Sequence, residues 1–326
     1  MHEYKSRARA FGFSTRAPRA FIEIRTKHGF VSKLGALSEV GDAMEEIGVA
    51  VAQVGVTDDP CYNAEVVGAA IKEARTVLPQ CNLVVFPELV SSGYFCGNRL
   101  PGVATRPGSG PVGMAVCEAA RSENVYVAYG YAEQGDLPGV FYDSAVLISP
   151  AGRVIANYRK VHVLPREAQY FASGDRLALV ETELGPIGLL VCWDVAFPEP
   201  ARAYAMAGAH LLVVLAAWEN PYGPEWELAV RARALDNGLY VAGCNRFGVE
   251  GDTMFAGGSL VCDPLGRVLA EAPADAPHVA TAVLNANRLV KARLEFATQI
   301  RELRPDAYGR LQRLSEEGSD RAWKAD

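Results

Sequence analysis

Histidine is scarce in this chain. Only five occur among 326 residues, beside 32 Lys and Arg and 38 Asp and Glu. The seven cysteines are scattered, and no two form a Cys-x-x-Cys pair, so neither a disulfide framework nor a zinc site is indicated. We therefore expect no metal and no organic cofactor, and unpaired cysteines favour a reducing cytoplasm as the location.

Excess basic charge and long apolar runs are missing as well. The net charge of −6 leaves no cationic surplus to meet phosphates, which argues against a nucleic acid or an anionic membrane as partner. No apolar run approaches the ~20 residues of a membrane-spanning helix, and the run at 209–218 has only the length of a strand. Half of the residues are hydrophobic, which is enough to build a large core.

The first 43 residues differ from the rest in composition. They contain eight Lys or Arg against four Asp or Glu, and they lack the apolar segment of a secretory signal. This character suits an organelle transit peptide, but a partly disordered extension or sequence upstream of the true start is also compatible with it. Because Met44 stands directly before the first strand-like run, we expect residues 1–43 to be accessory to catalysis.

Residues 44–312 are expected to form one domain, followed by a polar tail at 313–326. Segments 149–152 and 263–266 are typical of hairpin turns. So many strand-like runs with so few helices indicate an α/β fold in which sheets stack on each other and helices lie outside. Strands are expected near 47–55, 82–87, 125–132, 141–149, 153–159, 177–183, 187–192, 210–217, 239–245, 256–262, 267–271 and 279–284. Helices are expected near 62–78, 110–123, 198–208, 224–237 and 286–294.

A cysteine stands at one junction between a strand and a helix. Cys192 closes the apolar run that begins at Ile187, and the Ala-rich segment after Pro198 is typical of a helix. Helix-start N–H groups favour a thiolate, so this position suits a nucleophile. Since no histidine lies beside Cys192 in the sequence, its base must be another kind of residue.

Two other strand-like runs lead to charged residues. Glu88 ends the apolar run that begins at Asn82, and Lys160 follows the run 154–158, with Glu167 a few residues further on. The ends of strands in a layered α/β domain can converge on one edge, where active sites often form. Glu88, Lys160 and Glu167 are therefore candidates to act together with the cysteine.

Ordinary structural interpretations of these residues stay open. A lone cysteine in an apolar strand is usually a small buried hydrophobe, which suits Cys244 and Cys262. Lys160 could be a solvated loop lysine, and Glu167 could pair with Arg166 at the surface. A glutamate at the end of a buried strand, in contrast, is costly without a purpose.

Taken together, the motifs resemble those of the nitrilase, or carbon–nitrogen hydrolase, superfamily. The similarity covers about residues 46–312, and three ordered motifs at family-like intervals make it specific. It implies a four-layer α-β-β-α sandwich and a homodimer in which helices of two subunits pack together, among them 199–208. The matching segments are 47–53, Phe86-Pro87-Glu88, Tyr158-Arg159-Lys160-Val161-His162-Val163, Cys192-Trp193-Asp194, Phe197-Pro198-Glu199, 231–237, Asn245-Arg246, Gly258-Ser259 and 263–266.

The resemblance implies a thiol-dependent hydrolase. Cys192 would attack a carbonyl carbon, while Glu88 would take the thiol proton, pass it to the leaving nitrogen and then activate water to cleave the thioester. A carboxylate in this role needs a raised pKa, or at least a dry pocket close to the thiol. Lys160 and the N–H of Trp193 would stabilise the oxyanion. Glu167 matches the second glutamate of many family members and would orient Lys160 and the substrate nitrogen.

Residues near these strand ends are the expected wall of the substrate pocket. Tyr94, Trp193 and Trp218 are the aromatic candidates for substrate binding, and Asp194 and Glu219 are the charged ones. Two carboxylates favour a cationic or amine-bearing substrate, and no isolated arginine stands out as a clamp for a carboxylate. The Cys-Trp-Asp motif with Phe-Pro-Glu behind it resembles N-carbamoylputrescine amidases, whereas nitrilases more often have Cys-Trp-Glu.

Three functions are therefore considered. The favoured one is a cytoplasmic hydrolase that cleaves a C–N bond of a small amide or N-carbamoyl compound through a Cys thioester and releases ammonia. A nitrilase would use the same residues through a thioimidate. A non-catalytic homologue that acts as a binding module is the third, and the intact set of Glu88, Lys160 and Cys192 argues against it. The expected partners are the small substrate and a second copy of the chain.

Overall fold

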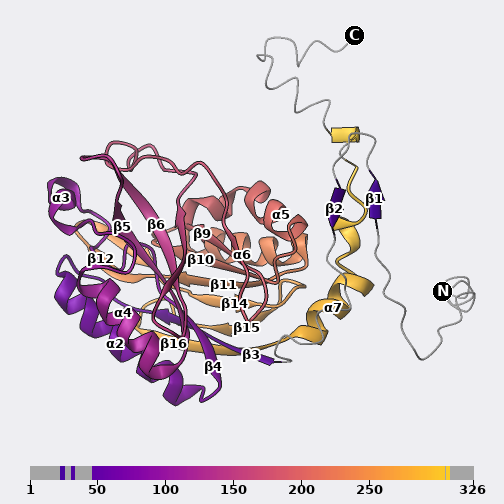
Figure 1. Ribbon diagram of the computed structural model, residues 1–326, viewed down its shortest axis with the longest axis horizontal. Coiled ribbons are helices and arrows are strands. Elements are labelled where there is room, and N and C mark those ends of the chain that lie inside the picture. The colour runs from indigo at the N-terminus through magenta and orange to yellow at the C-terminus, as the bar shows by residue number, and fades with distance from the viewer. Residues whose placement is uncertain (1–22, 26–30, 34–45, 305, 309–326) are drawn as a thin grey trace, which may run out of the picture. The chain divides into compact units, whose positions relative to one another are not determined.

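The computed structural model describes residues 23–25, 31–33, 46–304 and 306–308 (Figure 1). The predicted polar tail at 313–326 lies outside the described residues, and so does most of the basic segment 1–43.

Contacts within the chain divide it into two units, residues 1–43 and residues 44–326. In the first unit, strands β1 (Glu23–Arg25) and β2 (Val31–Lys33) pair antiparallel. The accessory role expected for this segment remains a prediction.

In the second unit, the described residues contain two six-stranded sheets. The strands of the first sheet, in spatial order, are β16 (His278–Asn285), β3 (Glu46–Gln53), β4 (Cys81–Val85), β5 (Tyr126–Gln134), β6 (Phe141–Ile148) and β7 (Val154–Arg159). Strands β3, β4 and β5 run parallel, and the other neighbours pair antiparallel.

The second sheet has a similar mixed arrangement. Its strands, in spatial order, are β15 (Val268–Glu271), β14 (Leu260–Cys262), β11 (Tyr240–Asn245), β10 (Leu211–Ala216), β9 (Ile187–Val191) and β8 (Leu179–Val180). Strands β9, β10 and β11 run parallel in its centre. Each of these three strands is a continuous apolar or small-residue run, as expected where both faces of a parallel strand are covered.

Helices cover the outer faces of the two stacked sheets (Figure 1). Helices α2 (Pro60–Val77) and α4 (Gly110–Glu123) pack on the first sheet, and α5 (Pro198–Met206) and α6 (Gly223–Asn237) pack on the second. The expected four-layer α-β-β-α sandwich is therefore confirmed. Shorter or peripheral elements are α3 (Leu100–Val103), α7 (Ala286–Glu295) and the 3₁₀ turns Gly97–Arg99, Cys192–Ala196 and Thr298–Ile300.

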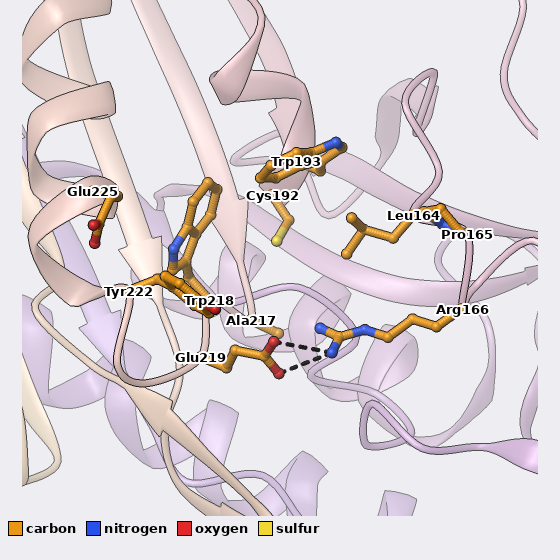
Figure 2. A pocket seen from close by; sticks show the side chains of 10 residues that line it. All are labelled: Leu164, Pro165, Arg166, Cys192, Trp193, Ala217, Trp218, Glu219, Tyr222 and Glu225. Carbon is orange, nitrogen blue, oxygen red and sulfur yellow. Dashed lines mark hydrogen bonds and ion pairs between the residues drawn. The ribbon is translucent and has the colours of Figure 1, made fainter.

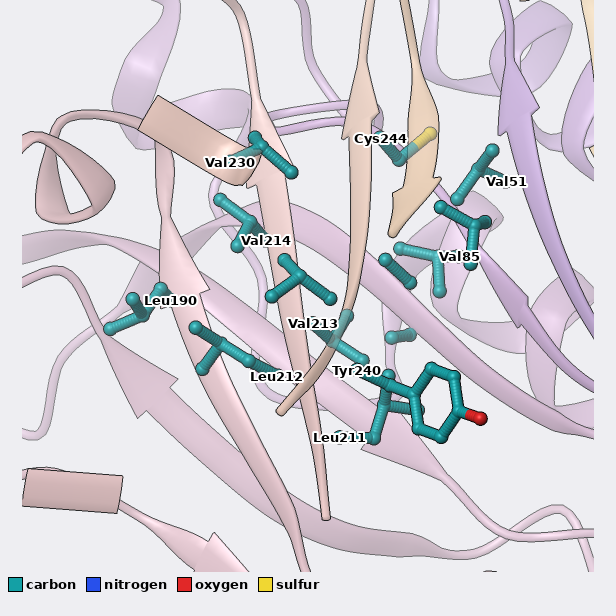
Figure 3. Packing of buried hydrophobic residues seen from close by; sticks show 14 of the residues in the cluster. Val51, Val85, Leu190, Leu211, Leu212, Val213, Val214, Val230, Tyr240 and Cys244 are labelled. Carbon is teal, nitrogen blue, oxygen red and sulfur yellow. The ribbon is translucent and has the colours of Figure 1, made fainter. Parts of the chain in front are cut away.

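Alternation along the strands builds two apolar layers. In β3, Val51 belongs to the cluster between the sheets, whereas Ala50 and Ala52 belong to the cluster under α2 and α4. Successive side chains of a strand point to opposite faces, so one strand serves both layers. Figure 3 shows Val51 and Val85 of the first sheet facing Val213 of β10.

Most predicted elements lie close to their expected positions, including the turns at 149–152 and 263–266. The hairpin of β12 (Phe247–Glu250) and β13 (Thr253–Ala256) was not predicted, because its short, partly exposed strands carry little apolar periodicity. Across the part of the chain that the structure describes, every helix is too short or too polar to cross a membrane.

Candidate active site

Strand ends from both sheets meet at one site. Glu88 comes shortly after β4, Lys160 directly follows β7, and Cys192 directly follows β9. Ala217 directly follows β10, and its backbone N–H donates a 2.7 Å hydrogen bond to Glu88 Oε2. The second sheet thereby holds a carboxylate that belongs to the first, as expected for converging strand ends.

The backbone of Cys192 is unusual. This residue opens a 3₁₀ turn, and its φ of 46° lies in the left-handed region, where residues other than glycine are strained. Asp194 stabilises the turn, because its Oδ2 accepts a 3.0 Å hydrogen bond from the N–H of Val191. Strain of this kind concentrates at functional sites, and here it presents the Cys192 side chain at the edge of the sheet.

The ammonium group of Lys160 is fully buried among three carboxyl groups. Nζ lies 2.6 Å from Glu88 Oε1 and 2.9 and 3.1 Å from the two oxygens of Glu167. The third carboxyl group is that of Asp143, whose Oδ2 lies 3.2 Å away. Water is excluded from these groups, so their charges interact far more strongly than they would at the surface.

Glu167 is held from several directions. Its Oε2 accepts a 3.0 Å hydrogen bond from the N–H of Leu164, and the Tyr94 hydroxyl donates to Oε1. The carboxylate is buried and faces Lys160. The surface pair of Glu167 with Arg166, which the sequence left open, is not formed.

Burial and charge set the protonation of this cluster. Burial raises the pKa of Glu88, but the positive charge of Lys160 and the hydrogen bond from its ammonium group outweigh it and hold the pKa below its usual 4.5. Burial disfavours the charged form of Lys160, yet Glu88 and Asp143 raise its pKa well above 10.5. Glu88 is therefore an anion and Lys160 a cation at neutral pH. A base here needs either a raised pKa or a dry site, and Glu88 meets the second condition.

The Cys192 thiol has a raised pKa. Burial and then repulsion by Glu88 shift it well above its usual 9.0, and attraction to Lys160 only partly offsets this. The expectation of a thiolate stabilised by helix-start N–H groups is therefore wrong, because the buried site beside an anion outweighs them. The thiol is neutral at neutral pH, and Glu88 is the neighbouring anion that can take its proton.

This protonation pattern predicts an unusual pH profile for alkylation of Cys192. An ordinary thiol reacts about tenfold faster per pH unit below its pKa, because only the thiolate attacks. We expect the alkylation rate of Cys192 by iodoacetamide to change much less than that between about pH 6 and 8, since Glu88 is already ionised and accepts the proton. Peptide mapping separates Cys192 from the exposed Cys61, and glutathione is the control. A tenfold rise per unit at Cys192 would show that it titrates as an ordinary thiol.

Asp143 is a buried member of the cluster that the sequence analysis missed. It lies on β6, and its Oδ1 has no hydrogen-bond partner among the described residues. Burial and repulsion by Glu88 raise its pKa well above 3.8, so Asp143 is protonated beside the anionic Glu88. The signal that was available is a charged residue inside the otherwise apolar run of β6.

The same three carboxyl groups have the spacing of a metal site. One oxygen from each of Glu88, Asp143 and Glu167 lies within 4.8 Å of the others. Lys160 Nζ already contacts all three and occupies the position that a bound cation would take. The residues present therefore do not fit a metal ion at this place.

We expect Asp143→Asn to be tolerated far better than Asp143→Leu. Asparagine can still donate to Glu88 and accept from Lys160, as the protonated aspartic acid does, whereas leucine leaves both groups short of a partner. Hydrolysis by Asp143→Asn should stay within about tenfold of wild type, and Asp143→Leu should lose about a hundredfold. Steady-state kinetics and thermal unfolding measure both variants. Equally large losses would show that the charge of Asp143, not its proton, is required.

A cavity of about 490 Å³ opens beside Cys192 (Figure 2). This volume lies in the range of roughly 300–1,000 Å³ typical of small-molecule pockets. The rings of Trp193 and Trp218 lie 5.5 Å apart and form an aromatic wall, and the expected pocket residue Glu219 also lines the cavity. The residues around the cavity are Leu164, Pro165, Arg166, Cys192, Trp193, Ala217, Trp218, Glu219, Tyr222 and Glu225.

Asp194 does not line this cavity, which corrects its expected role in substrate binding. Its side chain is completely buried. Its oxygens accept hydrogen bonds from the N–H groups of Val191 and His162, at 3.0 and 2.9 Å, and from the Tyr158 hydroxyl at 2.8 Å. The third position of the turn directs the carboxylate inward, so Asp194 supports the geometry of Cys192.

Tyr94 and Arg166 also differ from expectation. Tyr94 is buried behind Glu167, to which it donates a hydrogen bond, and it is not among the residues around the cavity. Arg166 lines the cavity, and its guanidinium pairs with Glu219 at 2.9 Å. Arg166 was not predicted as a pocket residue, because its partner Glu219 comes from a loop that is distant in the sequence.

Two stacked mixed sheets with helices outside, and a buried thiol, lysine and carboxylates at the strand ends, describe an α-β-β-α hydrolase architecture. The family model "Carbon-nitrogen hydrolase" matches residues 48–294. The chain therefore belongs to the carbon–nitrogen hydrolase family of the nitrilase superfamily.

Several known proteins are similar to this chain. An (R)-stereoselective amidase from a Pseudomonas species is 38% identical over 240 residues, which cover 73% of this chain and 84% of the amidase. A nitrilase from Pyrococcus abyssi is 33% identical over 255 residues, covering 77% of this chain and 94% of the nitrilase. The crystal structure of a carbon–nitrogen hydrolase from Helicobacter pylori superposes with a TM-score of 0.75 at 27% identity, covering 82% and 98% of the two chains.

Proposed function

We propose that this protein is a thiol-dependent amidase that hydrolyses a small amide or N-carbamoyl compound and releases ammonia. Membership of the carbon–nitrogen hydrolase family supports a hydrolase. The observation that carries the finer proposal is the neutral Cys192 thiol, which lines a cavity and lies beside the buried, anionic Glu88. This pair can generate a sulfur nucleophile without a histidine.

In the first half-reaction, Glu88 takes the proton from Cys192 as the sulfur attacks the carbonyl carbon. The positive charge of Lys160 stabilises the oxyanion that forms, together with the N–H of Trp193. Glu88 then passes its proton to the nitrogen, the C–N bond breaks, and ammonia leaves. The acyl group remains on Cys192 as a thioester.

Water completes the cycle in the second half-reaction. Glu88 takes a proton from the water, whose oxygen attacks the thioester carbon and forms a second oxyanion near Lys160. The C–S bond breaks, the carboxylic acid leaves, and Glu88 returns its proton to the Cys192 sulfur. Glu167 fixes the position of the Lys160 ammonium throughout, because it contacts Nζ with both oxygens.

A nitrilase is the second candidate, and the similarity to a protein named nitrilase supports it. The same thiol would add to a nitrile carbon to give a thioimidate, which water would convert into acid and ammonia. Because both substrates release ammonia, a nitrile and its corresponding amide must be compared directly.

We also propose that the chain forms a homodimer in a reducing compartment. Helices α5 and α6 expose Met206, Leu228 and Leu235, which are 49%, 68% and 38% accessible, and such apolar side chains favour burial against a second copy. All seven cysteines are within the described residues, and all are free thiols. Light scattering during size-exclusion chromatography would measure the mass, and a monomer would contradict the dimer.

The function is tested by measuring ammonia release from a panel of substrates. The panel contains aliphatic and aromatic amides, ω-amides, N-carbamoyl amines, N-carbamoyl amino acids and nitriles. Turnover of an amide or carbamoyl compound supports the proposal. Turnover of nitriles alone would favour the nitrilase, and silence across the panel with unreactive Cys192 would favour a non-catalytic binding module.

A further inference from the structure

The cavity beside Cys192 contains one ion pair, formed by Arg166 and Glu219. Arg166 Nη1 lies 3.0 and 2.9 Å from the two carboxylate oxygens, and the two side chains are 42% and 25% accessible. Figure 2 shows this pair on one side of the cavity, with Glu225 beyond Trp218. Arg166 is the only Lys or Arg among the described residues that line the cavity, and it is already paired with Glu219.

Both partners of the ion pair are held by neighbouring elements. The guanidinium of Arg166 lies over the ring of Tyr94, 5.5 Å from its centroid. The backbone of Glu219 bridges to Phe255 of the β12–β13 hairpin. The pair is therefore built into the wall, unlike two long side chains that meet by chance at a surface.

The remaining wall of the cavity is mostly apolar. Leu164 and Pro165 form one part of it, and Trp193, Trp218 and Tyr222 form another. A wall of aromatic and aliphatic side chains suits an aromatic or bulky apolar group packed against it. The volume of about 490 Å³ leaves room for such a group beside the reacting carbonyl.

We propose that this cavity selects neutral amides with an apolar or aromatic acyl group, and that the Arg166–Glu219 pair excludes amides that also carry a carboxylate. A substrate carboxylate would have to compete with Glu219 for Arg166 while lying close to Glu219 and Glu225, which costs electrostatic energy. A cationic substrate gains little from Glu219, which is neutralised by Arg166, or from Asp194, which faces away from the cavity. This inference rests on the proposed amidase function and names its substrate class.

The first test compares two amides on the wild-type protein. We expect kcat/KM for 3-phenylpropanamide to exceed that for succinamate, the monoamide of a dicarboxylic acid, by about a hundredfold. Binding of both compounds to Cys192→Ala, followed by the fluorescence of Trp193 and Trp218, gives a readout that needs no turnover. Preference for succinamate in either measurement would overturn this inference and leave the amidase proposal intact. Absence of both binding and turnover with either compound would overturn both.

The second test frees Arg166 without adding any new group. Glu219→Gln removes the charge that neutralises Arg166, so kcat/KM for succinamate should rise about tenfold or more. Glu227→Gln is the matched control, because it also removes one negative charge and frees an arginine, Arg231, but does not line the cavity. We expect its effect on succinamate to be at most about twofold.

A double variant completes the design. In Glu219→Gln/Arg166→Gln no cation remains to bind the substrate carboxylate, so the gain in succinamate hydrolysis should disappear. Comparable gains in Glu219→Gln and Glu227→Gln would show a general charge effect and overturn the proposal. Persistence of the gain in the double variant would also overturn it.

Discussion

Cys192→Ala should abolish hydrolysis while the protein stays folded. The cavity left by a missing sulfur atom is small, and the backbone strain at φ 46° is the same for alanine as for cysteine. No other group can replace the Cys192 nucleophile. The neighbouring carboxylate of Glu88 cannot attack in its place, because its Oε1 contacts Lys160 and its Oε2 accepts from the Ala217 N–H. We expect a loss of about 10⁴-fold or more in kcat, as found when a nucleophile is removed from other covalent enzymes.

The measurement combines kinetics with mass spectrometry. Wild-type protein quenched during turnover should carry an acyl adduct on the peptide that contains Cys192, and the alanine variant should carry none. Cys61→Ser is the control, because Cys61 is exposed and would otherwise contribute background labelling. It should retain normal activity and the adduct. Comparable turnover by Cys192→Ala would exclude the covalent mechanism.

The positions of the candidate catalytic residues could be predicted because they follow from strand chemistry. Buried parallel strands such as β9 and β10 appear in the sequence as continuous apolar runs, so their ends are visible without a structure. Glu88 and Cys192 stand after such strands, whereas Lys160 follows β7, a partly exposed antiparallel strand at the edge of its sheet. The structure brings all three together where the two sheets meet.

The directions of side chains could not be predicted in the same way. Asp194 is adjacent to Trp193 in the sequence, yet one is buried under the turn and the other lines the cavity. The left-handed backbone at Cys192 sets this difference, and no residue pattern in the sequence predicts that conformation. The ion-pair partner of Arg166 could not be predicted either, since Glu219 lies 53 residues away and is brought close only by tertiary packing.

The protonation states of the buried groups could not be predicted from the sequence either. A sequence shows that Cys192 precedes a helical segment, but not that an anionic carboxylate is buried beside it. The sequence likewise shows Asp143 only as a charged residue within a largely apolar strand. Its protonation depends on the neighbouring Glu88 and Lys160, which only the fold brings close. Interactions among buried charges depend on distances that a linear pattern does not contain.

Lys160→Met is the second substitution with a large expected effect, on both activity and stability. Activity should fall by about 10²–10³-fold, because the charge that stabilises the oxyanion is lost. Methionine fills similar space but leaves the buried Glu88 and Glu167 without their common counter-ion. Breaking a buried ion pair in this way costs roughly 3–5 kcal/mol, which is less than the total stability of most domains.

Lys72→Met is the matched control for this variant. It makes the same change of side chain on the exposed face of α2, at a residue that contacts none of the site's side chains. Urea denaturation of the two variants and of the wild type gives the free energies of unfolding. A loss of less than about 1 kcal/mol in Lys160→Met, with activity retained, would show that the ammonium neither balances nor orients the carboxylates.

The pH dependence of the stability loss distinguishes charge imbalance from a packing defect. In the wild type, the folded-state pKa of Glu88 lies below its usual 4.5, so this group contributes stability above that pH and loses it as the pH falls through the folded value. Without Lys160, burial raises the folded-state pKa of Glu88 instead, which reverses the sign: the protonated form is favoured, and stability is lost as the pH rises above about 4.5. The difference in unfolding free energy between wild type and Lys160→Met should therefore be largest near neutral pH and shrink on acidification. A difference that stays constant from about pH 4 to 7 would mean that packing, not charge, accounts for the loss.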